Sequence, residues 1–434
     1  MIQQFDIKNF KCHDDINQFR FPGLTVISGT NNSGKSSLLQ AIYLLTQNTS
    51  GNYPVLALND ELKLGSFSDI LNKSRQSYET IEIAVEFAKP SLENKGFEQL
   101  SVNLVYKNAT TFNRLNISYF EDNPVLFRME IQYKTLEQQV KYLELEIVDR
   151  ENMSLYKLSG SEKGFCKVNG IVPEQVIYSN MKQENRRICS KDMDKIRDCL
   201  SLLNKDNIKY LRAFRLDDFI EKSNSTNPNI GLSGEYTAEI INSKWYILTD
   251  FEDKHGKPLG FSELFDVWVS YFLGKNYRVR SKLIDRGKYK IVVDETGQGL
   301  ELTLNQVGFG ISQLLPILTM ILTSKPNDII LIENPEVHLH PKLQAGLVDL
   351  CIFALQKGRK LLIETHSEHV INRIRVRMKE NPDLLTKTNI YFFEKEDGTM
   401  KTTEIEVTKE GKINYWPKNF FDQSYYDLLG LIEQ

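Results

Sequence analysis

The chain has 434 residues, of which 41% are hydrophobic and 26% are charged, and its formal net charge is −3. These values are typical of a globular protein. The length allows two or three domains with a core that is stable without disulfides or metal ions. The near-neutral charge excludes a global polycation, so any contact with DNA or RNA has to come from local basic patches.

The cysteine pattern and the N-terminus indicate the compartment. The cysteines are odd in number, scattered and never spaced as CxxC, which argues against a disulfide framework or a zinc knuckle and fits a reducing environment. The N-terminal "MIQQFDIKNFKCHDD" lacks the apolar core of a signal peptide. No apolar run approaches the roughly 20 residues that cross a bilayer. We therefore expect a cytoplasmic protein without membrane contact.

Residues 1–48 predict strand, strand, loop and helix. "QQFDIKNFK" alternates in polarity, "FPGLTVISG" is a short apolar strand closed by glycine, and "SSLLQAIYLLTQ" repeats apolar residues at helical spacing. Between about 80 and 300, short alternating segments predict strands at 80–87, 100–108, 114–120, 126–134 and 141–149. We expect a polar helical stretch, a loop rich in Asn and Ser, and an amphipathic helix to follow at 182–203, 221–236 and 262–274.

After residue 300 the sequence again predicts alternating helices and strands, as it does at 1–48. A helix-like run at 311–324 leads to the strand "DIILIE", then to a helix and to the strand "KLLIETH". "FFEKEDGT" and the aromatic tail at 414–433 are expected to form a closing strand and helix.

The strongest chemical signal is "GTNNSGKSS", which we call the phosphate loop. Gly29, Gly34, Lys35 and Ser36 have the GxxxxGK[ST] spacing, after an apolar strand and before a helix. The backbone N–H groups would cradle phosphates, Lys35 would reach the β and γ phosphates, and the Ser36 hydroxyl would bind Mg²⁺. Four short side chains complete the expected nucleotide site: Asn31, Asn32, Ser33 and Ser37.

Further polar residues follow the apolar segments of the C-terminal part. Glu333 ends the strand "IILIE" and is the expected second Mg²⁺ ligand; without a phosphate loop it would be only the end of a core strand. In "VGFGISQLLPIL", Gly310 and Ser312 predict a second anion-binding helix start, with Ser312 as its cap and Pro316 within or near the first turns. His366 ends "LLIETH" beside the expected phosphate site.

Asn334 raises the question of turnover, because an acid commonly follows the metal-binding acid and activates water. An amide orients water but cannot take its proton, which removes general-base help of about 10²–10⁴-fold unless another group supplies it. Glu336, beyond Pro335, and His366 are the candidate substitutes. Positioning and charge stabilisation carry most of phosphoryl transfer, so the sequence is compatible with slow hydrolysis.

The order of these motifs resembles the ABC-type ATPase heads of the SMC and RecF superfamily, as does the opening "FDIKNFKCHDDINQFRFPGLTVISGTNNSGKSSLLQAIYLL". "IENPEVHLHP" and "ETHSEHVINRI" look most like the OLD-type ATPases (overcoming lysogenization defect) and relatives in bacterial phage-defence operons. "YLRAFR" and "WPKNFFD" resemble a subgroup of these prokaryotic ATPases.

The resemblance implies an α/β fold, with an ATPase head of mixed sheet and P-loop helix and a large inserted α+β lobe. The head would comprise 1–90 and 296–434, and the lobe 91–295. Two heads would dimerise around two ATP molecules, with Ser312 and the backbone near Gly310 contacting a γ-phosphate in trans. His366 would sense the same phosphate, and Lys8, Asn9 or Phe10 would border the adenine.

OLD-type enzymes continue into a Toprim-type nuclease module, for which the residues after "ETHSEHVINRI" are too few. We therefore expect a slow or partner-gated ATPase, a homodimer or higher oligomer, that regulates a separate effector, a nuclease, in anti-phage defence. One alternative is a RecF-like DNA-repair ATPase, motivated by the basic stretches at 185–197, 277–290 and 373–379. Another is a scaffold locked by ATP without turnover.

Overall fold

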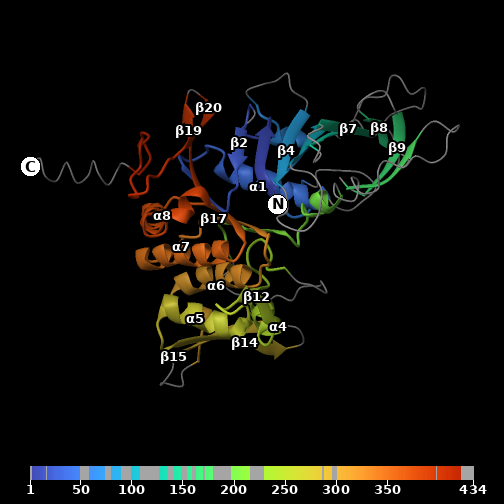
Figure 1. Cartoon of the computed structure of the whole chain (residues 1–434). Coiled ribbons are helices and arrows are strands. Elements are labelled where there is room, and N and C mark those ends of the chain that lie inside the picture. The colour runs from blue at the N-terminus through green and yellow to red at the C-terminus, as the bar shows by residue number, and fades with distance from the viewer. Residues whose placement is uncertain are drawn as a thin grey trace, which may run out of the picture. The chain divides into compact units, whose positions relative to one another are not determined.

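The computed structural model describes most of the chain (Figure 1), namely residues 2–15, 17–48, 58–73, 80–88, 99–107, 127–134, 140–147, 154–158, 163–169, 172–178, 197–215, 229–285, 288–295, 301–396 and 398–421. The chain divides into two compact units. Unit 1 comprises 1–21, 32–208 and 395–401, and unit 2 comprises 22–31, 209–394 and 402–434. The expected boundaries of head and inserted lobe stay a prediction.

Unit 1 contains a nine-stranded sheet in the order β10-β9-β8-β7-β6-β5-β4-β1-β2, in which every neighbouring pair is antiparallel. Its strands are β1 (Ile2–Lys8), β2 (Asn17–Arg20), β4 (Thr80–Ala88), β5 (Gln99–Lys107), β6 (Phe127–Lys134), β7 (Val140–Ile147), β8 (Ser154–Leu158), β9 (Lys163–Asn169) and β10 (Val172–Tyr178).

The alternation that predicted these strands is visible in β4. Ile81, Ile83, Val85 and Phe87 are buried, while the residues between them are half-buried. Four of the five strands predicted between 80 and 149 are confirmed, and the one at 114–120 lies outside the described residues. Helices α1 (Lys35–Leu45) and α2 (Phe67–Ile70) belong to the same unit.

Unit 2 is built on a six-stranded sheet in the order β11-β17-β18-β3-β19-β20. The strands are β11 (Ile208–Leu211), β17 (Ile329–Glu333), β18 (Lys360–Glu364), β3 (Leu24–Gly29), β19 (Thr388–Glu396) and β20 (Thr399–Glu404). β17, β18, β3 and β19 are parallel neighbours. β17 and β18 are buried at every position, as expected for parallel strands covered on both faces. The predicted α/β fold is confirmed.

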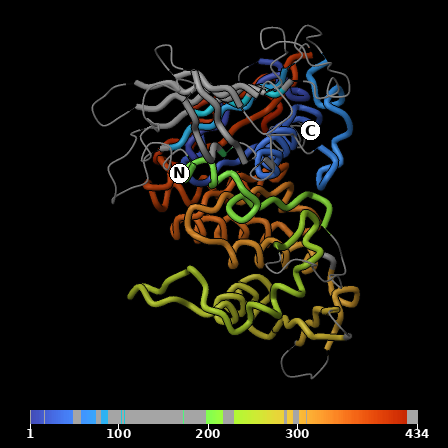
Figure 2. The backbone as a smooth tube through the Cα atoms, turned by 90° about the vertical axis from the view of Figure 1, so that its right-hand side faces the viewer, coloured from blue at the N-terminus to red at the C-terminus, as the bar shows by residue number. Residues whose placement is uncertain are grey.

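Helices α5 (Phe261–Leu273), α6 (Phe309–Leu322), α7 (Pro341–Gln356) and α8 (Glu368–Glu380) pack in sequence order, and α4 (Thr237–Lys244) contacts α6. Figures 1 and 2 both show α6 and α7 side by side. Two small sheets, β12-β13 and β14-β15-β16, complete the unit. Their strands are β12 (Leu248–Glu252), β13 (Pro258–Gly260), β14 (Tyr277–Asp285), β15 (Lys288–Glu295) and β16 (Glu301–Thr303).

One prediction about a helix needs correction. α6 begins at Phe309 with Gly308 as its N-cap, so Ser312 lies inside the first turn and does not cap the helix, and Pro316 lies well inside it. The prediction placed the start too late because a proline usually marks a first turn. In the aromatic tail, residues 414–421 form turns and bends, and the predicted helix stays a prediction because the rest of the tail lies outside the described residues.

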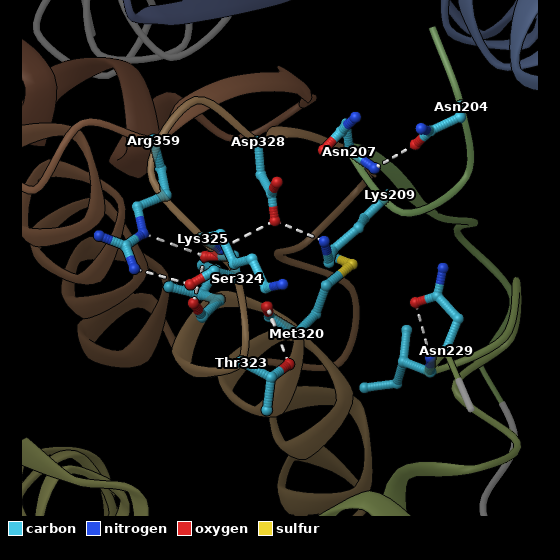
Figure 3. A network of polar contacts seen from close by, with 12 residues as sticks. Asn204, Asn207, Lys209, Asn229, Met320, Thr323, Ser324, Lys325, Asp328 and Arg359 are labelled. Atoms are coloured by element: carbon cyan, nitrogen blue, oxygen red, sulfur yellow. Dashed lines mark hydrogen bonds and ion pairs between the residues drawn. The ribbon is translucent and has the colours of Figure 1, made fainter. Parts of the chain in front are cut away.

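A buried polar network holds the amino ends of β17 and β18 (Figure 3). The Arg359 guanidinium donates to the carbonyl oxygens of Ser324 at 2.7 Å and Asp250 at 3.2 Å, and it stacks 3.8 Å from the Phe251 ring centroid. Asp328 accepts from Lys209 Nζ at 2.5 Å. Burial lowers the pKa of Arg359 to about 10. The network lies at the amino ends of these strands. The predicted site residues of this unit lie at the opposite, carboxyl ends of the strands.

Candidate nucleotide site

The phosphate loop begins where β3 ends, and its first glycine is required by the sheet. Gly29 has a φ of 151°, and a Cβ there would lie 1.9 Å from the carbonyl oxygen of Phe393 on β19. The next residue, Thr30, donates its N–H to the same oxygen at 3.0 Å. No larger residue fits between these two strands, so the neighbouring strand selects glycine here.

The second part of the loop, from Asn32, belongs to unit 1 and winds into α1. Asn32 and Gly34 have φ values of 60° and 93°, in the left-handed region that favours Asn and Gly. Gly34 is the N-cap of α1 and Lys35 its first residue. The first N–H groups of a helix have no intrahelical acceptor and form the positive end of the helix dipole, which is the local geometry of an anion site.

The side chains of the loop differ in exposure. Asn31 and Asn32 are exposed, Ser36 and Ser37 are half-buried, and Ser33 and Lys35 are buried. Exposure therefore falls along the loop, from the two asparagines to Ser33 and Lys35 at the start of α1.

A histidine missed at the sequence level supports this loop from within unit 1. His13 is fully buried, and its Nε2 lies 3.1 Å from the Gly34 carbonyl oxygen. Because a carbonyl only accepts, Nε2 carries the proton. Burial lowers the pKa of His13 to about 4, so the ring is neutral at pH 7. Only its position in the turn after β1 could have indicated this role.

The other residues expected near a nucleotide base are engaged within unit 1. Phe10 is fully buried, and Asn9 donates to the Thr80 carbonyl at 2.6 Å. Lys8 forms an ion pair with Glu82 at 2.8 Å and is partly exposed. Asn9 and Phe10 thus contribute to the structure of unit 1, and an adenine contact by Lys8, Asn9 or Phe10 stays a prediction.

Glu333 ends β17 inside unit 2 and is held by two donors from the neighbouring edge strand and its extension. The Tyr210 hydroxyl donates to its Oε1, and the Ala213 N–H donates to its Oε2 at 3.0 Å. Burial, with the Glu333 charge as a second cause, raises the pKa of Tyr210, which keeps the hydroxyl protonated as a donor. Glu333 itself is 7% exposed.

Arg215 binds the carboxyl end of the same strand. Its guanidinium donates to the Glu333 carbonyl oxygen at 2.5 Å and to that of Asn334 at 3.3 Å. Burial lowers the pKa of Arg215 to about 10, and the carboxylates of Glu336 and Glu333 oppose that shift. The guanidinium is therefore a buried cation beside two predicted site residues.

Asn334 has a structural reason to be asparagine. Its φ is 42°, in the left-handed region that asparagine tolerates better than most residues, and its N–H donates to the Glu364 carbonyl at 2.8 Å. This turn sends the chain towards Glu336. The residue thus shapes the backbone at the place where an acid was expected.

Glu336 and His366 are brought together within unit 2. The His366 N–H donates to Glu336 Oε1 at 2.6 Å, while Glu336 Oε2 is buried and has no hydrogen-bond partner among the described residues. Burial raises the pKa of the Glu336 carboxyl, although the His366 N–H and the Arg215 charge favour its ionised form. The His366 side chain is exposed. Glu336 is thus a buried carboxylate with one oxygen open to a further partner.

The strand order places these residues on the edge where the phosphate loop starts. Glu333 is in register with Glu364 on β18, and Glu364 with Ile27 on β3. Two strand spacings amount to about 10 Å. Glu364, which is 3% exposed, is a further acid at this edge that the sequence did not single out. The carboxyl ends of parallel strands meet at one edge, which is the usual ligand-binding place of such sheets.

The predicted trans-acting residues lie at the start of α6. A Cβ on Gly310 would lie 3.0 Å from the His338 carbonyl oxygen, so the glycine allows α6 to approach the turn after β17. Ser312 is 2% exposed. Their contact with a phosphate of a second chain stays a prediction.

Among the described residues, no group of three or more His, Cys, Asp or Glu side chains could hold a metal ion unaided. Mg²⁺ bound with a nucleotide uses one or two carboxylates, substrate phosphates and water. A carboxylate has about four acceptor positions, so Glu333 can accept its two donors and still take part. Ser36 and Glu333 belong to different units, and their joint metal site stays a prediction.

Comparison with known proteins decides the family. A family model described as AAA ATPase domain matches residues 1–371, most of the chain. The chain belongs to the AAA ATPase domain family. Membership implies nucleotide binding, in agreement with the geometry of the phosphate loop in this AAA ATPase. A second family model, described as a protein of unknown function (DUF3696), matches residues 386–431.

No curated protein matches this AAA ATPase. Solved structures with some similarity include an SMC head bound to the C-terminal winged-helix domain of ScpA, with 14% identity, a TM-score of 0.49, and coverage of 94% of this chain and 98% of that chain. The SMC head domain from Thermotoga maritima has 12% identity, a TM-score of 0.42, and coverage of 94% and 99%. An SMC head domain from Pyrococcus furiosus, bound to the C-terminal domain of ScpA, has 12% identity, a TM-score of 0.47, and coverage of 100% and 99%. At these TM-scores the likenesses carry no functional inference.

Within the described part of the chain, no helix is long and apolar enough to cross a membrane.

Proposed function

We propose that this AAA ATPase binds and slowly hydrolyses ATP, with Glu336 as the general base in place of the usual acid at position 334. The observation that carries the proposal is the state of the Glu336 carboxylate. It is buried, one oxygen is fixed by the His366 N–H, and the other has no hydrogen-bond partner among the described residues.

The residues of the chain divide the work of such a reaction. The phosphate loop would bind the phosphates and Lys35 would neutralise their charge. Mg²⁺ would be held by Ser36, Glu333 and phosphate oxygens, and would offset charge on the phosphates. Asn334 would orient water, and Glu336, whose pKa is raised by burial, would accept its proton. His366 is the second candidate base.

Three variants compared under one assay test this assignment. Glu336→Gln should lower kcat by about 10²–10⁴-fold, the usual contribution of a general base. Asn334→Gly, which tolerates the φ of 42° at that position, should change kcat much less. His366→Ala shows whether the exposed imidazole contributes.

Two results would decide against Glu336. Turnover by Glu336→Gln at the wild-type rate would refute its role as base. A kcat loss with His366→Ala alone would move the role to His366. Because a base must be ionised, wild-type kcat should also rise with pH as Glu336 deprotonates, and the variant should lose that rise.

We further propose that ATP joins two or more heads and that the assembly regulates a separate cytoplasmic effector, a nuclease, in anti-phage defence. The support is the resemblance of "IENPEVHLHP" and "ETHSEHVINRI" to OLD-type ATPases. Co-purification with a neighbouring gene product, and loss of phage protection when that product is removed, would test this role. A chain that stays alone and leaves infection unchanged would contradict it.

The alternative of a DNA-repair ATPase finds less support in the basic stretches. In the stretch 373–379, Arg373 and Arg377 both bind Asp349, at 2.7 Å and 2.6 Å. In the stretch 277–290, Arg280 pairs with Asp266 at 2.7 Å and stacks on Trp245. These charges are already compensated inside unit 2. The stretch 185–197 lies almost wholly outside the described residues.

A further inference from the structure

The segment Tyr210–Arg215, "YLRAFR", makes three contacts with the end of β17. The first is the Tyr210 hydroxyl on Glu333 Oε1, and the second is the Ala213 N–H on Glu333 Oε2 at 3.0 Å. The third is the Arg215 guanidinium on the Glu333 carbonyl at 2.5 Å. One short segment therefore holds both the carboxylate and the backbone of the same acid.

These contacts restrict the side chain that is expected to meet Mg²⁺. A free glutamate side chain loses rotamer freedom when it is immobilised. Two donors, one on each oxygen, remove that freedom before any ligand arrives. Because each carboxylate oxygen has two lone-pair positions, both oxygens can still accept a metal-bound water or the metal.

Arg215 acts on the backbone beside the acid. It is 2% exposed and its bonds go to the carbonyl oxygens of Glu333 and Asn334. Those carbonyls flank the left-handed turn at Asn334, after which the chain reaches Glu336. A buried guanidinium without its acceptors is costly, so Arg215 and this turn stabilise one another.

We propose that Tyr210 and Arg215 are positioning residues that preset Glu333 for a magnesium–nucleotide complex. The inference rests on the proposed nucleotide site and adds to it the residues that orient its acid. Partners of metal-binding carboxylates typically contribute 10–100-fold to metal affinity. Neither residue is assigned a contact with the nucleotide or the reacting atoms.

Matched controls exist in the same unit. The Tyr271 hydroxyl donates a hydrogen bond to Asp349 at 2.5 Å. Tyr271→Phe therefore removes a tyrosine–carboxylate bond that does not involve Glu333. Arg359 is 1% exposed and donates to carbonyl oxygens at the amino ends of β17 and β18 (Figure 3), so Arg359→Lys matches Arg215→Lys. The controls report the cost of losing such a bond as a purely structural element.

The measurement is the affinity of full-length protein for a fluorescent ATP analogue as a function of Mg²⁺ concentration, with an EDTA sample for metal-free affinity. Tyr210→Phe should raise the Mg²⁺ concentration at half-saturation by about tenfold or more and leave the EDTA affinity unchanged. Arg215→Lys should shift it in the same direction. Tyr271→Phe and Arg359→Lys should behave as wild type.

A Mg²⁺ dependence of Tyr210→Phe equal to that of wild type or of Tyr271→Phe would overturn the inference while leaving the nucleotide site intact. Absence of nucleotide binding by the wild-type protein would overturn the proposed function and the inference together. If Arg215→Lys fails to fold, Tyr210→Phe decides alone, because it removes only one oxygen atom.

Discussion

At the scale of single residues, each unit contains buried polar groups, among or beside the predicted site residues, whose protonation is set by their surroundings. His13 is neutral beneath the phosphate loop, Arg215 remains a cation beside carboxylates, and Glu336 carries a raised pKa. In each case burial is the largest cause, and neighbouring charge or hydrogen bonding opposes it. Within each unit these groups are therefore held by their surroundings, which is the condition for electrostatic stabilisation at low cost.

His13 yields a prediction about stability and pH. Its pKa is about 4 in the folded chain and near 6.5 when unfolded, so at pH 5 the unfolded state binds a proton that the folded state does not. The His13 contribution to the free energy of unfolding should therefore be fully present above pH 6.5. It should fall by about 2 kcal/mol between pH 6.5 and 5, at about 1.4 kcal/mol per pH unit.

Denaturant unfolding of wild type and His13→Gln at both pH values measures this contribution. Glutamine can still donate to the Gly34 carbonyl but does not titrate, so the variant should lose less stability than wild type over this range. Equal losses in the two proteins would show that His13 is not the titrating group.

At the scale of elements, neighbouring strands determine which residue fits at the end of a strand and which groups hold it. β3 can end in the phosphate loop only because its last residue, Gly29, leaves room for the Phe393 carbonyl of β19. β17 can end in a held acid because the edge strand β11 and its extension supply Tyr210 and Ala213. The chemistry of each strand end thus depends on a partner far away in the chain.

Gly29→Ala tests the first of these dependences. The added Cβ would lie 1.9 Å from the Phe393 carbonyl oxygen, which forces β3 and β19 apart. We expect the free energy of unfolding to fall by about 1–3 kcal/mol, the range for overpacking. We also expect loss of nucleotide binding. Thermal unfolding and analogue binding measure the two effects. Gly308→Ala is the control, because a Cβ there meets nothing within 4 Å. Wild-type behaviour of Gly29→Ala would contradict the close approach.

The elements also show what the sequence could and could not predict. Apolar runs ending in Glu333 and His366, and the amphipathic pattern at 262–274, predicted β17, β18 and α5 correctly. β11 was missed because four residues carry little periodicity, and its pairing with β17 depends on the fold. For the same reason, Tyr210, Arg215 and Glu364 were not predicted as parts of the site. The predicted start of α6 was too late because Pro316 was given more weight than Gly308, which is the N-cap in the structure.

At the scale of the whole molecule, the chain combines two compact units with a phosphate loop whose residues are divided between them. Residues 22–31 belong to unit 2, and the chain enters unit 1 at Asn32. Family membership extends over 1–371 and therefore includes residues of both units.

The proposed assembly is tested by molecular mass in solution. With ATP and Mg²⁺, Glu336→Gln should hold nucleotide without turnover and give at least twice the mass of the ATP-free protein. Lys35→Ala should stay at the smaller mass, because loss of the phosphate contact prevents the step that precedes association. A mass independent of ATP in Glu336→Gln would contradict assembly through nucleotide.

The central claim is that a triphosphate is bound by the phosphate loop around Lys35. Equilibrium binding of a fluorescent ATP analogue to wild type and to Lys35→Ala, with Mg²⁺ and with EDTA, tests it most directly. We predict saturable binding by wild type that EDTA weakens, and at least about tenfold weaker binding by the variant, since a hydrogen bond to a charged group contributes about 1.5–3 kcal/mol. Equal affinity of the two proteins, or no binding by wild type, would contradict the claim.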